Sequence, residues 1–109
     1  VSAHLLIRRS GEIIQYVPFD RRAWHAGASC YRGRETCNDF SIGIELEGTD
    51  DSPYEAIQYQ HLNAVIDALL AAYPTLSRAH ITGHEHIAPA RKTDPGPHFD
   101  WSRLRQAGR

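Results

Sequence analysis

The segment Gly83–Gly96 brings side chains that can bind a metal ion and stabilise charge into one stretch bounded by glycine and proline. It contains two imidazoles, His84 and His86, together with the carboxylate of Asp94 and the ammonium group of Lys92. Histidine and carboxylate are both zinc ligands, and a catalytic zinc ion has about three protein ligands with one position open to water. The spacing indicates a zinc site with a lysine facing the substrate, although a solvated polar loop would have the same composition.

Four strings that follow one another extend from Val1 to about Trp101: VSAHLLIRRSGEIIQYVP, RAWHAG, CNDFSIGIELEG and GHEHIAPARKTDPGP. In this order they resemble the zinc-dependent N-acetylmuramoyl-L-alanine amidases, and within that family the likeness is strongest to the AmpD-type 1,6-anhydro-N-acetylmuramyl-L-alanine amidases. The resemblance implies a cytoplasmic hydrolase of bacterial cell-wall recycling. With Zn²⁺ as cofactor, it would cleave the amide bond between N-acetylmuramic acid and L-alanine in muropeptides. Anhydro-muropeptides and intact cell wall both remain open as substrates.

The resemblance also assigns roles to individual residues. In the family, zinc is bound by a histidine and an aspartate at the positions that fall on His84 and Asp94. By the same comparison Glu45 is the catalytic glutamate, and Lys92 stabilises the oxyanion that forms on the amide carbonyl. The remaining expected contacts are with the substrate, and they fall on His25, Asn38 and Arg91.

The chemistry of Glu45 fits a general base, because a carboxylate beside an activated water can accept its proton and later deliver it to the leaving amine. Glu47 lies two residues further along the same predicted strand and therefore on the same face. Alternation alone does not separate the two glutamates, and each could equally be a charged residue on an exposed strand face. The resemblance favours Glu45.

The chain departs from the family pattern in three places. His86 stands where the family usually has an aspartate, so we expect it beside the ligands or on the surface, and Thr36 replaces a basic residue. The family's first zinc histidine ends an apolar strand upstream of the position of Val1. We therefore expect the C-terminal part of a larger amidase, without the first strand, that binds zinc weakly by itself. An inactive peptidoglycan-binding module and a fragment without its own function are the alternatives.

Composition limits the remaining possibilities. A length of 109 residues, with 41% hydrophobic and 23% charged residues, fits one globular domain over residues 1–109. The net charge of −1 argues against nucleic acid as a partner, because phosphate binding usually requires a basic surplus. No apolar run approaches the ~20 residues of a membrane-spanning helix. We expect Cys30 and Cys37 to be free thiols in a reducing compartment, with one local disulfide as the alternative.

The first half of the chain is predicted to contain strands and one long loop. Apolar runs at Ala3–Arg8 and Glu12–Val17, separated by a Ser-Gly turn, predict a β-hairpin. His4, in the first run, is either a polar residue near the cleft or a satisfied structural histidine. The segment Pro18–Cys37 lacks any periodicity and predicts a long functional loop. Alternation over Ser41–Glu47 predicts a strand with its aliphatic residues on one face.

The second half contains one clear helix. Apolar residues recur over Leu62–Tyr73 at the spacing of one helical face, and the capping-box pattern at Ser52–Glu55 predicts where the helix begins. Arg78–Thr82 predicts a short strand, and Asp100 would cap a final short helix through Ala107. This order of elements predicts an α/β fold in which a mixed β-sheet is flanked by helices.

Overall fold

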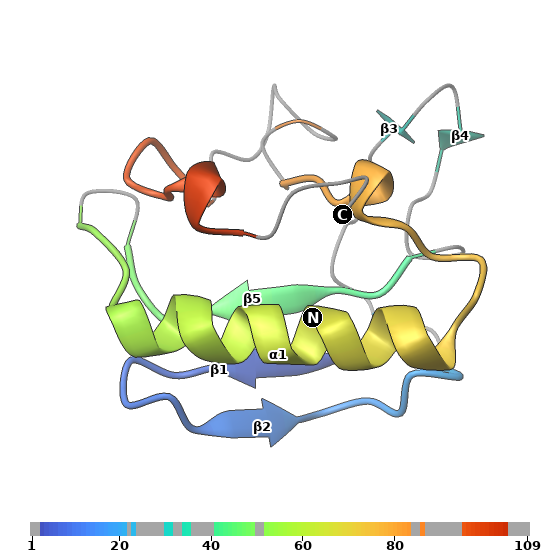
Figure 1. The fold of residues 1–109 in the computed structure, drawn as a ribbon, viewed down its shortest axis with the longest axis horizontal. Coiled ribbons are helices and arrows are strands. Elements are labelled where there is room, and N and C mark those ends of the chain that lie inside the picture. Colours follow the sequence, from blue (N-terminus) through green and yellow to red (C-terminus); the bar gives the residue numbers. More distant parts are fainter. Residues whose placement is uncertain are drawn as a thin grey trace.

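The computed structural model consists of a small mixed sheet with one long helix packed along it (Figure 1). The sheet has three strands in the order β2-β1-β5, and a separate two-stranded sheet pairs β3 with β4. The residues that the structure describes are 3–21, 23, 30, 31, 34, 35, 41–49, 52–83, 86 and 95–104. Within these residues the elements are β1 (Leu5–Ile7), β2 (Ile13–Gln15), β3 (Cys30–Tyr31), β4 (Arg34–Glu35), β5 (Ile44–Leu46), α1 (Ala56–Ala72) and the 3₁₀ helices η2 (Arg78–His80) and η3 (Trp101–Arg103).

The predicted hairpin is confirmed. Strands β1 and β2 pair antiparallel, with Leu6 opposite Ile14. The turn between them closes through two backbone hydrogen bonds, from Arg8 N to Glu12 O and from Gly11 N to Arg8 O, each 2.8 Å long. Gly11 has a φ of 92°, a conformation that residues with a Cβ rarely adopt, which explains the glycine at this turn.

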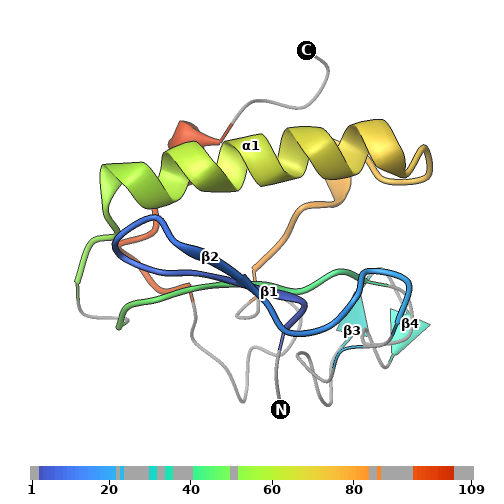
Figure 2. The same ribbon diagram turned by 90° about the horizontal axis from the view of Figure 1, so that it is seen from below.

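The predicted mixed sheet is also confirmed, because β5 pairs with β1 in parallel. Leu6 lies beside Glu45 in the register, and Ile7 lies beside Leu46. Ile7 is fully buried against the helix side of the sheet, and Leu46 packs on the same core. Figure 2 shows α1 covering one face of the sheet. By alternation, Leu6 and Glu45 therefore belong to the face that α1 does not cover.

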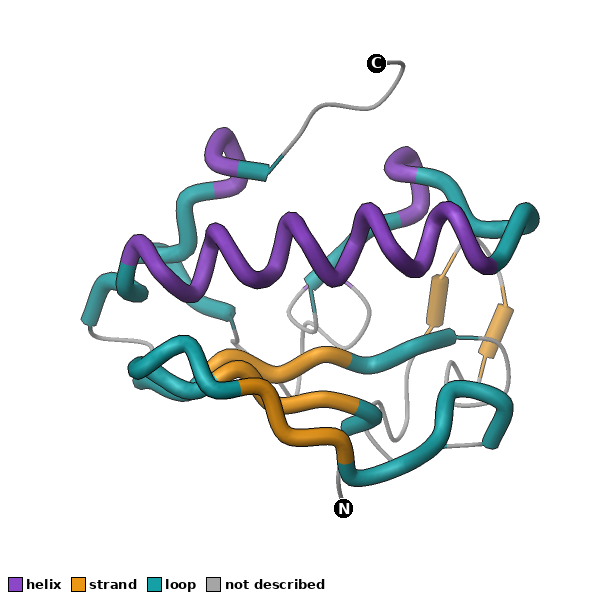
Figure 3. Tube along the Cα trace, turned by 60° about the horizontal axis from the view of Figure 1, so that its bottom comes forward, coloured by secondary structure: helices purple, strands orange, loops and turns teal. Residues whose placement is uncertain are grey.

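The core lies between the sheet, α1 and the C-terminal segment. Figure 3 shows α1 running roughly along the direction of the strands, with η3 beside its N-terminal half and η2 beside its C-terminal half. The helix packs its apolar face into this core, as the periodicity predicts. Aromatic rings of the C-terminal segment pack into the same core. The buried residues of this cluster are Ile7, Tyr54, Tyr59, Leu62, Ile66, Phe99 and Leu104.

The predicted start of α1 at Ser52–Glu55 is wrong by one turn, because Glu55 is the N-cap and the helix begins at Ala56. The Glu55 backbone N donates to Gln58 Oε1 at 2.8 Å, so the capping partner comes from the first turn of α1. The Ser52 hydroxyl is instead used by Arg9 Nη2, 3.0 Å away. Tyr54, which would lie in the predicted first turn, is buried in the core.

Three other predictions need correction. The predicted long loop Pro18–Cys37 contains the short ribbon of β3 and β4. The predicted strand Arg78–Thr82 is wrong, because η2 forms there and Arg78 donates to Asp67 of α1. Asp100 caps η3 as predicted, through a 3.0 Å bond from Ser102 N, but η3 ends at Arg103 and residues 105–109 lie outside the described part of the chain. Among the residues that the structure describes, no helix is long and apolar enough to cross a membrane.

Candidate active site

Glu45 occupies the middle of β5, and the strand backbone determines where its side chain lies. Its neighbours Ile44 and Leu46 both pack against the core, so the Glu45 carboxylate is on the opposite face of the sheet, where it is exposed. No other described residue forms a hydrogen bond or ion pair with this carboxylate. An exposed carboxylate that is not engaged in the local structure is available to take a proton from a substrate or water.

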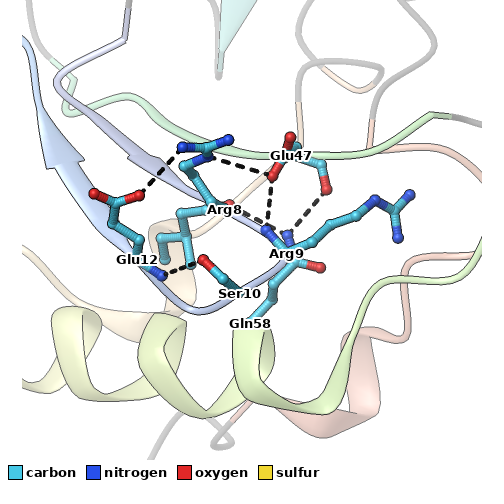
Figure 4. Close-up of polar contacts among 7 residues, drawn as sticks. Arg8, Arg9, Ser10, Glu12, Glu47 and Gln58 are labelled. Atoms are coloured by element: carbon cyan, nitrogen blue, oxygen red, sulfur yellow. Dashed lines mark hydrogen bonds and ion pairs between the residues drawn. The ribbon is translucent and has the colours of Figure 1, made fainter.

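Glu47 differs from Glu45 because it is part of the connection between β5 and the hairpin turn (Figure 4). Its Oε1 accepts a 2.9 Å hydrogen bond from Arg9 N and lies 3.7 Å from Arg8 Nε. Its backbone N donates to Ile7 O at 2.9 Å, which continues the parallel pairing beyond β5. The two glutamates that alternation could not separate therefore have different environments, and the Glu47 carboxylate is engaged in holding the turn.

Gln58, on α1, forms hydrogen bonds to the backbone at the ends of β1 and β5 (Figure 4). The side chain is fully buried, and its Nε2 donates to Ile7 O at 3.2 Å and to Glu47 O at 2.9 Å. Its Oε1 accepts from Glu55 N, so both ends of the amide are paired. Sequence analysis missed this residue, yet Gln58 is a polar residue four positions before Leu62 on an apolar helix face, and that signal could have identified it.

The ends of the site segment Gly83–Gly96 are held against each other. A Cβ on Gly83 would lie 2.8 Å from Pro95 Cδ and 3.1 Å from Trp101 Cζ2, so only glycine fits without displacement. The hydroxyl of Tyr54 donates to Pro95 O at 2.8 Å, and Gly96 has a φ of 86°. Gly83 directly precedes His84 and Pro95 directly follows Asp94, so the contact joins the chain neighbours of both candidate ligands.

An aromatic cluster anchors the C-terminal end of this segment to α1. The Phe99 ring packs edge-on against Trp101, with centroids 4.8 Å apart, and lies 5.4 Å from Tyr59 of α1. The Tyr59 hydroxyl accepts a 2.9 Å bond from Asp100 N. Aromatic pairs of this kind contribute about 0.5–1.5 kcal/mol each beyond their buried area. The cluster therefore gives Pro95 a rigid support on the core.

The other predicted site residues fall mostly outside the described part of the chain. His86 is described; it is exposed, and its ring lies 5.9 Å from Trp101, which fits the expected surface position. Among the described residues, no three His, Cys, Asp or Glu side chains form a group that could hold a metal ion. The predicted residues that lie outside the described part are the ligands His84 and Asp94, the catalytic Lys92, and the substrate contacts His25, Asn38 and Arg91.

His4 is a structural histidine, the second of the two predicted possibilities. It is 1% exposed, and its ring forms hydrogen bonds through both nitrogens to backbone groups. Nδ1 accepts from Gly43 N at 3.0 Å, and Nε2 donates to Arg21 O at 2.7 Å. Since a metal ion would need one of these nitrogens, His4 is not available as a ligand in this structure.

The chain matches known proteins over most of its length. The family model described as N-acetylmuramoyl-L-alanine amidase matches residues 1–97. The chain is 68% identical over 105 residues to the 1,6-anhydro-N-acetylmuramyl-L-alanine amidase AmpD of Citrobacter freundii, covering 96% of this chain and 56% of the relative. It has the same identity to AmpD of Escherichia coli K12, of which it covers 57%. The chain thus spans about half the length of the curated relatives it matches.

Two solved structures are similar over nearly the whole chain. The crystal structure of a Se-Met AmpD derivative superposes with a TM-score of 0.92 at 67% identity, covering 95% of this chain and 57% of that one. The second is the Escherichia coli amidase AmiD in complex with the substrate anhydro-N-acetylmuramic acid-L-Ala-D-γ-Glu-L-Lys. It superposes with a TM-score of 0.85 at 38% identity, covering 94% of this chain and 46% of that one.

Proposed function

Because the chain belongs to the N-acetylmuramoyl-L-alanine amidase family, we propose that it carries out zinc-dependent hydrolysis of the amide bond between anhydro-N-acetylmuramic acid and L-alanine. The 68% identity to AmpD of Citrobacter freundii supports the anhydro-muropeptide as the substrate. The substrate in the AmiD complex, an anhydro-N-acetylmuramyl peptide, is of the same class. The reaction belongs to peptidoglycan recycling, and we place it in the cytoplasm.

The metal is assigned to His84 and Asp94, whose imidazole and carboxylate suit zinc. The contact between Gly83 and Pro95 supports this pair, because each candidate ligand is one residue from that contact and consecutive Cα atoms are about 3.8 Å apart. The chain constraint thus favours two ligands that converge. Zinc held there would supply polarisation of the amide carbonyl and would acidify a water molecule.

The proton transfers are assigned to Glu45. The observation that carries this proposal is its exposed carboxylate on the face of the sheet that α1 does not cover, with no bond to another described residue, while Glu47 is engaged with the turn. Glu45 would accept the proton of the attacking water and later donate it to the departing L-alanine amine. Lys92 would stabilise the negative charge on the carbonyl oxygen, and His25, Asn38 and Arg91 would contact the muropeptide.

A matched pair of substitutions tests the proposal. Glu45→Gln replaces a carboxylate within β5, and Glu47→Gln replaces the carboxylate one residue beyond its end, each by an amide of the same size. We expect Glu45→Gln to lower kcat by about 10²–10⁴-fold, the usual contribution of a general base, and to leave bound zinc unchanged. Glu47→Gln should retain kcat and lower stability slightly. The assay is chromatographic release of the peptide from anhydro-N-acetylmuramyl-tripeptide by the longest chain that the gene encodes.

The reverse pattern, with Glu47→Gln inactive and Glu45→Gln active, would refute the assignment. Absence of peptide release by the unaltered protein in the presence of zinc would refute the amidase proposal itself.

A further inference from the structure

The buried imidazole of His4 connects two segments that are distant in sequence. Gly43 N donates to Nδ1 over a separation of 39 residues, and Nε2 donates to Arg21 O over 17 residues. A carbonyl oxygen only accepts, so the ring hydrogen is on Nε2 and the lone pair of Nδ1 faces Gly43. His4 is therefore present as one neutral tautomer, with a different hydrogen-bonding role for each nitrogen.

On one side, the ring fixes the start of strand β5. The carbonyl of Gly43 accepts from His4 N at 2.9 Å and from Leu5 N at 3.2 Å, and its N–H is held by the imidazole. Gly43 is buried and lies before the first register pair between β1 and β5, which joins Leu5 to Ile44. The His4 ring thus accepts a hydrogen bond from the buried N–H of Gly43, just before the first paired residue of β5. Leaving this N–H without a partner would cost free energy of folding.

On the other side, the same ring contacts the turn that follows β2. Phe19 stacks on the imidazole, with ring centroids 5.9 Å apart and an interplanar angle of 28°. Arg21 N donates to Pro18 O at 3.0 Å, which closes the turn, and Arg21 O accepts from the ring. The imidazole therefore fixes the turn and the start of β5 with respect to each other.

We propose that His4 is a positioning residue for Glu45, an inference that rests on the proposed role of Glu45 as general base. No other described residue binds the Glu45 carboxylate, so the position of that carboxylate depends on how the backbone of β5 is held. Gln58 and Ile7 hold the strand at the Glu47 end, and His4 holds it at the Gly43 end. A displacement of about 1 Å at a catalytic group can lower the rate by about 100-fold, so the attachment matters for catalysis.

Two substitutions at His4 separate positioning from a purely structural role. His4→Asn places an amide oxygen where Nδ1 was, so it retains the acceptor for Gly43 and loses the donor to Arg21. His4→Gln places an amide nitrogen where Nε2 was, so it retains the donor to Arg21 and loses the acceptor for Gly43. Each variant loses one neutral hydrogen bond, and we expect similar losses in melting temperature.

The expected kcat values differ. His4→Asn should retain kcat within about twofold, whereas His4→Gln should lower it by about fivefold or more, the equivalent of one neutral hydrogen bond. Ile66→Val is the control for stability alone, because Ile66 lies in the core on α1 and its truncation should lower the melting temperature without lowering kcat. Equal kcat values in the two His4 variants, or a kcat that follows melting temperature across all three, would overturn the proposal.

A readout independent of activity separates this inference from the amidase proposal. Amide hydrogen exchange should show Gly43 N–H protected in the unaltered protein and in His4→Asn, and unprotected in His4→Gln. If the protein proved inactive, this pattern would still confirm the attachment of β5 while the amidase proposal failed. If neither His4 variant folds, Phe19→Leu removes the stacked ring and leaves both hydrogen-bonding nitrogens in place. Retained kcat and Gly43 protection in that variant would support the proposal, and loss of kcat with Gly43 still protected would overturn it.

Discussion

Gly83→Ala is expected to disrupt the proposed zinc site without changing any proposed ligand. The added Cβ would lie 2.8 Å from Pro95 Cδ and 3.1 Å from Trp101 Cζ2, whereas ordinary contact begins at 3.4 Å. The deficit at Pro95 is about 0.6 Å, and proline offers no flexible side-chain end that could move aside. The two ends of the site segment must therefore separate.

The size of that displacement determines which property suffers most. Overpacking of this kind costs about 1–3 kcal/mol in stability, which a folded domain can survive. Zinc–ligand distances, in contrast, tolerate only about ±0.2 Å, and changes next to the ligands typically cost about 10–100-fold in metal affinity. We therefore expect Gly83→Ala to fold, with zinc affinity lowered by about 10–100-fold and amidase activity lowered at limiting zinc.

Zinc affinity would be measured by competition with a chromophoric chelator, together with the melting temperature. Pro95→Ala is the matched control, because it removes Cδ and retains the carbonyl that accepts from the Tyr54 hydroxyl. The double variant Gly83→Ala with Pro95→Ala should recover much of the lost affinity, leaving only the tighter contact with Trp101. Unchanged zinc affinity in Gly83→Ala, or no recovery in the double variant, would show that this contact does not set the ligand geometry.

Three further predictions concern stability, catalysis and the metal. Gln58→Ala removes the side-chain partners of Glu47 O and Glu55 N and one of the two donors to Ile7 O, and it should cost about 2–3 kcal/mol by urea unfolding. Glu12→Gln, which breaks an exposed pair, should cost under about 1 kcal/mol, and equal losses would contradict the role of Gln58. Lys92→Ala should retain zinc and lower kcat by about 10²–10³-fold, and loss of zinc would make the lysine structural instead. The 109-residue chain should lose zinc to a mild chelator, since His84 and Asp94 supply two of about three protein ligands; stoichiometric zinc that survives the chelator would refute this.

Elements defined by local pattern were predictable from sequence. The hairpin follows from two apolar runs about a Ser-Gly turn, and α1 follows from apolar residues at the spacing of one helical face. The start of α1 was not predictable, because it depends on the tertiary contacts of Ser52 and Tyr54. Arg9, 43 residues away, takes the Ser52 hydroxyl, and the core takes the Tyr54 ring.

The segment Arg78–Thr82 is a second case in which tertiary contacts, and not the local sequence, determine the secondary structure. Its composition is compatible with a strand, yet the residues form η2, and Arg78 pairs with Asp67 of α1. The sheet order β2-β1-β5 contains no strand from this part of the chain. Ile81 packs against the core beside α1 rather than in the sheet. Tertiary contacts with the helix therefore override a weak local preference for the extended state.

For the candidate site, the sequence indicates which residue types are present, whereas the register between strands determines their environments. Glu45 and Glu47 are equivalent by alternation, and they differ only because β1 ends at Ile7, where the turn residue Arg9 meets Glu47 across 38 positions of the chain. A pattern within one strand contains no information about where its neighbour ends. Buried polar residues such as Gln58 are the signal that sequence analysis can still use, because a buried amide must have partners, and here those partners are the ends of the two strands that position Glu45.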